Sequence, residues 1–264
     1  MSDVWEAYAL KYAERNNRMR ADSFIMDDDH ASPHPLDYFV WLLRNGDETI
    51  LVDTGFDQTE ARNRERPILD SPADMLGGLG VSAEQIDRII LTHLHYDHAG
   101  DLTSYPNATL YLQEAEMVFA TGPCMCHDHM RMPFTGEHIC DAVRCLYDGR
   151  LNFVQGTAEI APGVETHWVG GHSRGLQFVR VRTERGWVVL ASDATHYYEN
   201  YRTGKPFPII ADMEEVQNGY RRLGQLAESD DHIIPGHDPL VRTLYPRLED
   251  RSDRIVVLHK EPQS

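Results

Sequence analysis

Thr-His-Leu-His-Tyr-Asp-His-Ala-Gly, residues 92–100, places four side chains that commonly bind metals within six residues. At a period of two, His93, His95 and Asp97 would share one face of an extended chain, and a turn would bring His98 to the same cavity. Imidazole and carboxylate groups suit zinc, iron, manganese or cobalt, and the lack of thiolates argues against a purely structural zinc. Burying these groups without a cation would be costly, because each would need its own partner. The stretch therefore predicts a metal site.

Short strands and helices are predicted to alternate on either side of this stretch. Residues 88–92 are β-rich and lead directly into the histidines, and two apolar runs flank the turn pair Asn45-Gly46, a pattern that favours a β-hairpin. Further strands are predicted at residues 108–113, 165–170 and 232–237 and as a hairpin over 176–194, with helices from residue 114 and over 213–227. Polar clusters follow the strands, where loops over a rigid scaffold usually carry reactive residues.

Residues 93–100, HLHYDHAG, resemble the signature of the metallo-β-lactamase superfamily, and the other motifs of that superfamily follow in order. They are Val52-Asp53-Thr54-Gly55, Gly170-Gly171-His172-Ser173, Ala191-Ser192-Asp193-Ala194 and Pro235-Gly236-His237-Asp238. The resemblance covers residues 37–237 and implies an α/β fold, an αββα sandwich of two mixed β-sheets flanked by helices. We expect one domain over residues 1–264, with a Cys/His-rich insertion at about 121–150.

The resemblance also implies two divalent metal ions held by seven residues. The implied ligands are His93, His95 and His172 for one ion, Asp97, His98 and His237 for the second, and Asp193 bridging both. Asp53 would lie behind them and fix an imidazole tautomer by a hydrogen bond, although a turn residue after a strand is the simpler interpretation. Zinc is the expected ion, with iron, manganese and cobalt as alternatives, because such sites accept several first-row metals.

Two ions about 3.5–4 Å apart lower the pKa of a bridging water and polarise a carbonyl, so the site suits hydrolysis of an ester, lactone, thioester or phosphodiester. Residues 93–100 and 192–208 resemble the N-acyl homoserine lactonase group, which includes 4-pyridoxolactonase-like enzymes. This resemblance implies a quorum-quenching lactonase that opens an acyl homoserine lactone, or a related aromatic or aliphatic lactone, by attack of a metal-bridging hydroxide. Asp97 and Asp193 would be catalytic as well as ligands.

One position departs from the lactonase pattern. That group usually has a Tyr three residues after the bridging Asp, where this chain has His196. An imidazole N–H at His196 could donate to the substrate carbonyl, with Tyr197 as the alternative donor and an exposed loop residue as the simpler interpretation. Tyr96 and Phe207 are expected to wall the substrate pocket, although such residues are more often plain core.

Other functions of this fold match less well. Flavodiiron proteins generally have Glu at the position of His95 and an added flavodoxin domain, and the nuclease branch usually has a basic arm or extra domain. A thioester hydrolase of the glyoxalase II type shares the seven ligands and is the main alternative. It often adds a basic helical domain, for which residues 238–264 are too short. A non-catalytic binding module usually lacks some ligands, whereas this set is complete.

The composition sets limits on the partners. The net charge is −17, from 42 acidic and 25 basic residues, which disfavours nucleic acid and anionic lipid. No apolar run approaches the roughly 20 residues that cross a bilayer, and residues 1–17 carry charges where a signal peptide is apolar. We expect a cytoplasmic protein that acts on a small-molecule lactone or ester, with neither nucleic acid nor membrane as a partner.

All four cysteines lie in the segment 121–150. They are Cys124, Cys126, Cys140 and Cys145. Their spacing matches none of the usual zinc patterns, and cytosolic thiols are normally reduced, so free thiols are expected. The same segment offers a surface for a homodimer.

Overall fold

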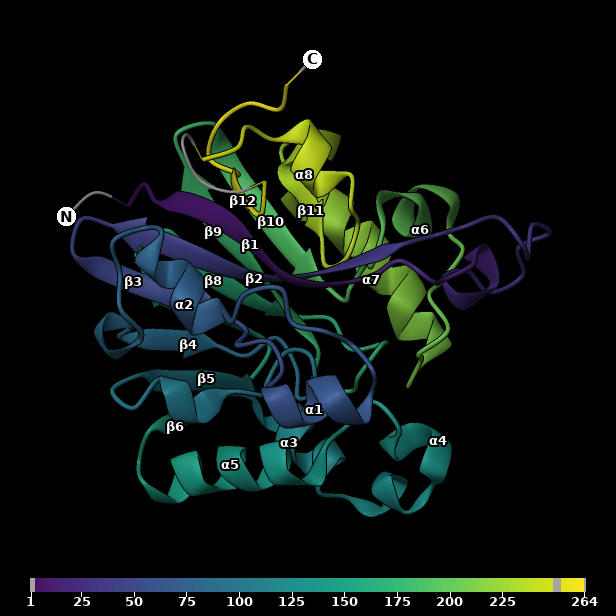
Figure 1. Ribbon diagram of the computed structural model, residues 1–264, viewed down its shortest axis with the longest axis horizontal. Coiled ribbons are helices and arrows are strands. Elements are labelled where there is room, and N and C mark those ends of the chain that lie inside the picture. The colour runs from purple at the N-terminus through teal and green to yellow at the C-terminus, as the bar shows by residue number, and fades with distance from the viewer. Residues whose placement is uncertain (1–2, 249–252, 264) are drawn as a thin grey trace.

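The computed structural model describes residues 3–248 and 253–263, and its strands form two mixed β-sheets (Figure 1). In spatial order, the larger sheet contains β12 (Ile255–Val257), β1 (Glu6–Arg15), β2 (Leu36–Asn45), β3 (Glu48–Val52), β4 (Arg88–Ile90), β5 (Thr109–Gln113) and β6 (Leu151–Val154). The smaller sheet contains β11 (Ile233–Pro235), β10 (Gly186–Ser192), β9 (Gln177–Thr183), β8 (Val164–Trp168) and β7 (Thr157–Ala161). Strands β3 to β6 run parallel and β12, β1 and β2 antiparallel to their neighbours, while β10 and β11 form a parallel pair in the otherwise antiparallel smaller sheet.

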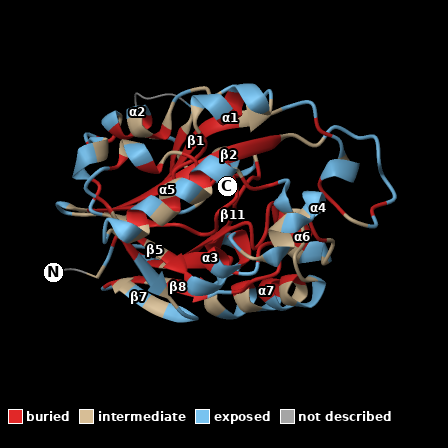
Figure 2. Ribbon diagram, turned by 90° about the horizontal axis from the view of Figure 1, so that it is seen from below, coloured by how far each residue is buried: buried red, intermediate tan, exposed pale blue. Residues whose placement is uncertain are grey.

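Helices cover the outer faces of the two sheets. The helices of the described chain are α1 (Gln58–Asn63), α2 (Pro72–Gly77), α3 (Glu114–Ala120), α4 (Asp128–Arg131), α5 (Gly136–Tyr147), α6 (Tyr198–Thr203), α7 (Met213–Leu226) and α8 (Val241–Leu244), with 3-10 turns at Arg20–Asp22, Ala83–Gln85, Leu102–Ser104, Pro123–Cys126 and Asp230–His232. Figure 2 shows α1 and α2 on one side of the buried strands and α7 on the other. The predicted αββα sandwich is therefore confirmed.

Strand β2 shows how the layers are held together. Its first eight residues, 36–43, are buried, as expected for a strand that is covered on both faces. Phe39 and Trp41 pack with valines of β9 and β10 in the cluster between the sheets. Tyr38 and Val40 point the other way, into the cluster under the helices. The hairpin predicted at Asn45-Gly46 is present, with Gly46 at φ 61° in the turn.

The loop that follows β4 corrects one expectation. Residues 91–100 do not form an extended chain with a period of two, because β4 ends at Ile90 and the backbone then turns. The N–H groups of His98 and Ala99 both donate to the carbonyl of His95, at 3.1 and 3.2 Å. Gly100 fixes this path, because a Cβ there would lie 2.6–2.8 Å from backbone atoms of Tyr96 and of the loop after β3. A tight turn, rather than strand alternation, brings the four side chains together.

The segment 121–150 is largely helical and packs in part against the larger sheet. Ala142 and Cys145 of α5 lie in the cluster that contains Leu151 of β6. All four thiols are free: Cys145 is buried, while Cys126 and Cys140 are exposed. The domain limits stay a prediction, and residues 1–2, 249–252 and 264 of the predicted domain 1–264 lie outside the described residues. Within the described chain, every helix is too short or too polar to span a bilayer.

Candidate metal centre

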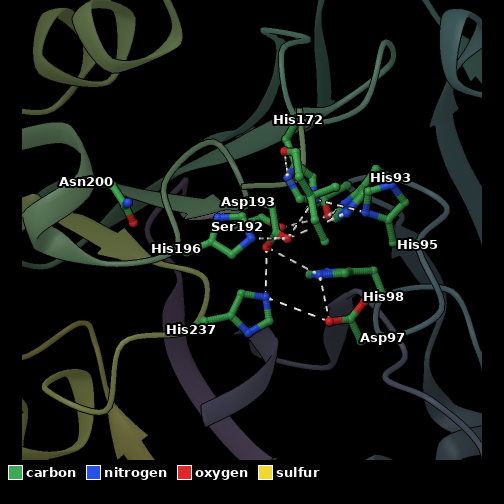
Figure 3. A network of polar contacts seen from close by, with 12 residues as sticks. His93, His95, Asp97, His98, His172, Ser192, Asp193, His196, Asn200 and His237 are labelled. Atoms are coloured by element: carbon green, nitrogen blue, oxygen red, sulfur yellow. Dashed lines mark hydrogen bonds and ion pairs between the residues drawn. The ribbon is translucent and has the colours of Figure 1, made fainter. Parts of the chain in front are cut away.

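Loops at four strand ends carry the predicted ligands to one place, as Figure 3 shows. The loop after β4 supplies His93, His95, Asp97 and His98. His172 follows β8, Asp193 follows β10 and His237 follows β11, so the last three come from the smaller sheet and the others from the larger one. The site therefore depends on the packing of one sheet against the other.

The side chains form two groups that share a carboxylate. Ligand atoms of His93, His95, His172 and Asp193 lie within 4.8 Å of one another, as do those of Asp97, His98 and His237. Asp193 lies between the groups: its Oδ2 is 3.1 Å from His172 Nε2, and its Oδ1 is 3.0 Å from His237 Nε2 and 3.4 Å from His98 Nε2. All seven predicted ligands are thus brought together, around the carboxylate predicted to bridge.

The chemistry of these buried atoms fits divalent cations. His93 Nε2, His98 Nε2 and Asp193 Oδ1 are buried and form no hydrogen bond, although His98 Nε2 and His237 Nε2 lie within 3.4 Å of Asp193 Oδ1. A cation among these atoms would relieve the cost of burying them. Burial lowers the pKa of His93 and His95 well below the ordinary value, which keeps both imidazoles neutral and able to bind a metal. Burial would also lower the pKa of His98, but the facing carboxylates outweigh it and raise the pKa, so a positive charge is favoured at this point.

The other ring nitrogens are held by groups outside the cluster. Nδ1 of His172 is 2.9 Å from the carbonyl of Ile209, and Nδ1 of His237 is 2.8 Å from the carbonyl of Asp37. Nδ1 of His98 lies 2.7 Å from Asp53 Oδ2. Because Nδ1 of His172 and Nδ1 of His237 each donate to a carbonyl, the lone pair of each neutral ring lies on Nε2, which faces the other candidate ligands.

Asp53 links the loop after β3 to the candidate ligands. Besides His98 Nδ1, its carboxylate accepts hydrogen bonds from the backbone N–H and the hydroxyl of Thr92, both at 2.8 Å. Asp53 is fully buried and has φ 62°, a backbone conformation that is uncommon for a residue with a side chain. These contacts favour an orienting role for Asp53 over a simple turn residue.

We expect Asp53→Ala to weaken zinc binding about 10- to 100-fold, the usual cost of losing a group that orients a metal-ligating histidine. The measurement is a zinc titration in competition with a chromophoric chelator. Asp47→Ala, at an exposed position in the β2–β3 turn, is the matched control and should bind zinc as the unchanged protein does. Equal zinc affinity in the Asp53 and Asp47 variants would contradict the orienting role.

His196 is not the exposed loop residue of the simpler interpretation. It is buried, its ring stacks on Phe207 with centroids 3.6 Å apart, and its Nε2 lies 3.0 Å from Asp193 Oδ2. Burial lowers the pKa of His196 to about 3, so the ring is neutral. One ring nitrogen also lies within 4.8 Å of candidate ligand atoms of Asp193 and His237, which makes His196 a further group able to reach a metal.

A cavity of about 360 Å³ opens beside the cluster, and Tyr96, His196 and Phe207 are among its lining residues. The hydroxyl of Tyr197 is directed elsewhere, because it donates to the carbonyl of Pro35 at 3.2 Å. This arrangement does not favour Tyr197 as the donor to a substrate carbonyl, and His196 is better placed.

Glu116 of α3 is a supporting residue that sequence reasoning missed. Its buried carboxylate accepts hydrogen bonds from Leu94 N at 2.9 Å, Ser173 Oγ at 2.6 Å and Gly175 N at 2.8 Å. It thereby ties the loop of His93 and His95 to the loop of His172. In the sequence it resembles any acidic residue in the first turn of a helix, so no local signal identifies it.

A family model described as the metallo-beta-lactamase superfamily matches residues 35–237. The chain belongs to this superfamily. An N-acyl homoserine lactonase of Bacillus cereus is 28% identical over 219 residues, covering 77% of this chain and 82% of that protein. Another, from Agrobacterium fabrum, is 29% identical over 248 residues, covering 85% of this chain and 79% of its own length.

Two solved structures are similar to this chain over most of its length. The structure of a quorum-quenching N-acyl homoserine lactone lactonase superposes with a TM-score of 0.74 at 26% identity, covering 90% of this chain and 93% of that one. An N-acyl homoserine lactone hydrolase, solved with N-hexanoyl-L-homoserine bound at its catalytic metal centre, gives a TM-score of 0.73 at 24% identity over 90% and 95% of the two chains. At that identity, the second likeness shows the fold alone.

Proposed function

We propose that this chain is a dinuclear metal-dependent hydrolase that opens the ring of a small lactone. The observation that carries the proposal is the convergence of seven candidate ligands around Asp193, beside a cavity lined by His196 and Phe207. The lactonase relatives support the choice of a ring ester as substrate. The proposed substrates are acyl homoserine lactones or related aromatic and aliphatic lactones.

The proposed ligands divide between two ions as the two groups of side chains do. His93, His95 and His172 would hold one ion, Asp97, His98 and His237 the other, and Asp193 both. When bound, two such ions lower the pKa of a water molecule and polarise the substrate carbonyl. Zinc as the resident ion, a homodimer and a cytoplasmic location stay predictions.

The chain's own residues would orient the substrate and move protons. His196 is neutral and lines the cavity, so its imidazole N–H would be the donor to a substrate carbonyl oxygen there. Water adds to the carbonyl, the ring C–O bond breaks and the leaving oxygen takes a proton, for which the carboxylates of Asp97 and Asp193 are the proposed carriers. The product is a hydroxy acid, which releases one proton at neutral pH. Stacking on Phe207 holds the imidazole of His196 in place.

A panel assay with the zinc-loaded protein tests the proposal. Acid release would be followed for short- and long-chain acyl homoserine lactones, for an aromatic γ-lactone such as pyridoxolactone, and for S-lactoylglutathione. We expect turnover of at least one lactone, loss of that turnover after chelation, and its return with Zn²⁺, Mn²⁺ or Co²⁺. Turnover of the thioester alone would replace the lactonase with a hydrolase of the glyoxalase II type, and turnover of none of the panel would overturn the proposal.

A further inference from the structure

The cavity beside the candidate metal centre is unusually rich in arginine for so acidic a protein. Its lining includes Arg15, Arg18, Arg64 and Arg66, whereas the chain as a whole has a net charge of −17. The acidic residues of the lining are Asp22, Asp97 and Asp193, and the last two are proposed metal ligands. With cations bound at those two aspartates, the cavity would carry excess positive charge inside a negative molecule.

Arg18 is the most enclosed of these arginines. It is 6% exposed, and its Nε is buried without a hydrogen-bond partner. One of its terminal nitrogens, Nη2, donates to the carbonyl of Asp22 and, at 3.2 Å, to Ser23 Oγ. Both of these acceptors are neutral. The guanidinium lies 5.3 Å from the ring centre of Phe207, the residue that stacks on His196.

Arg66 is a second arginine of the cavity lining. Its Nη1 donates to the hydroxyl of Tyr96, and its Nε is buried without a hydrogen-bond partner. The Tyr96 hydroxyl is 3.0 Å from that of Tyr38, whose ring centre lies 5.4 Å from that of His237. Aromatic side chains therefore link Arg18 to His196 and Arg66 to His237.

Among the described residues, three of the four arginines of the cavity lining have no carboxylate partner. Arg64 pairs with Glu60 at 2.6 Å, but within the described residues Arg15, Arg18 and Arg66 form no ion pair. Arg15 is half-buried at the end of β1. A buried guanidinium normally has a carboxylate or phosphate partner, because leaving the charge unpaired is costly. Three arginines without a carboxylate partner therefore line one cavity of about 360 Å³, which is large enough for an anion.

We propose that the substrate of this site carries an oxyanion group, a carboxylate or phosphate separate from the ring ester, which Arg15, Arg18 and Arg66 bind at the cavity. This inference rests on the proposed lactonase function and narrows its substrate class. A surface of net charge −17 repels anions, so a local cluster of arginines is what would allow such a substrate to bind. Planar guanidinium groups match carboxylate and phosphate in bidentate pairs, which would orient the ring toward the metal ligands.

The test compares lactones that differ only in this group. N-succinyl homoserine lactone carries a free carboxylate, and its succinamoyl analogue carries a neutral amide of the same shape. We expect the zinc-loaded protein to favour the carboxylate in kcat/KM by about 10- to 100-fold, the range for one hydrogen bond to a charged group. An analogue that ends in a phosphate monoester shows which of the two oxyanions is preferred.

Variants connect that preference to the arginines. Arg15→Gln and Arg18→Gln should each bring the carboxylate-to-amide ratio toward one, and Arg18→Lys, which keeps the charge, should retain part of it. Arg62→Gln is the matched control, because Arg62 is exposed on α1 and outside the cavity lining. Arg15→Gln is the cleaner variant if loss of Arg18 perturbs folding, since Arg18 also bonds within residues 18–23.

Binding of the matching γ-lactams, which resist hydrolysis, separates this inference from the proposed function. Calorimetry should show tighter binding of the succinyl lactam than of the succinamoyl lactam, and a smaller difference in Arg15→Gln. That result without turnover of any lactone would keep the oxyanion site and reject the lactonase. Turnover of both lactones with equal kcat/KM, and equal binding of both lactams, would overturn the oxyanion site and leave the lactonase intact.

Discussion

Asp193→Ala should leave fewer than two metal ions bound per chain and lower lactone hydrolysis by more than 100-fold. The carboxylate of Asp193 lies within 3.4 Å of imidazole nitrogens from both groups of candidate ligands. Loss of a group that merely orients a ligand typically costs about 10- to 100-fold, and a shared ligand should cost more. Elemental analysis of the purified protein gives the metal content, and the ring-opening assay gives the rate.

The control for this prediction is Asp128→Ala, which removes an exposed carboxylate of α4 that belongs neither to the cavity lining nor to the candidate ligands. It should keep full metal content and activity. His95→Ala tests the assignment a second way, because His95 belongs to only one of the two groups of candidate ligands. This variant should bind less metal per chain without losing metal binding altogether. Two ions per chain in Asp193→Ala, held as tightly as in the unchanged protein, would refute the assignment of the bridging ligand.

Resemblance to the metallo-β-lactamase superfamily implied the sandwich and the full set of candidate ligands, whereas the residues alone predicted a metal site at residues 93–98. Two apolar runs around Asn45-Gly46 predicted the β2–β3 hairpin, and imidazoles at close spacing, as in residues 93–98, are costly to bury without a cation. His172, Asp193 and His237 were assigned because their motifs match those of the superfamily in order, and each of these motifs follows a predicted strand.

What the sequence could not predict depends on contacts between distant segments. The turn at His95 to Ala99 is fixed by Gly100 packing on the loop after β3, a long-range contact that spacing alone does not reveal. The burial of His196 follows from its stacking on Phe207, and Arg18 reaches the cavity from the start of the chain, nearly 180 residues before His196. An isolated Arg in a sequence is usually a surface residue, so only the fold shows its relation to the site.

Glu116→Ala should destabilise the folded protein by about 3–5 kcal/mol and weaken metal binding as well. The variant leaves the N–H groups of Leu94 and Gly175 and the hydroxyl of Ser173 buried without an acceptor. Each hydrogen bond to a charged group contributes about 1.5–3 kcal/mol, and partial rearrangement of the loops makes the total loss smaller than the sum over the three bonds. The expected loss is still a large part of the usual free energy of unfolding, about 5–15 kcal/mol. Chemical denaturation with and without zinc measures both effects.

Two further variants separate the role of Glu116 in positioning the loops from a general effect of changing α3. Glu114→Ala removes an exposed carboxylate two residues earlier on the same helix and should change stability by less than about 0.5 kcal/mol. Glu116→Gln keeps one acceptor oxygen and should restore part of the stability and of the zinc affinity. If Glu116→Ala lost stability while its zinc affinity stayed unchanged, the carboxylate would hold the core together without positioning the loops of His93, His95 and His172. If stability and zinc affinity both fell in Glu116→Ala and both returned in part in Glu116→Gln, Glu116 would position the loops. The candidate centre would then extend from the strand ends into α3.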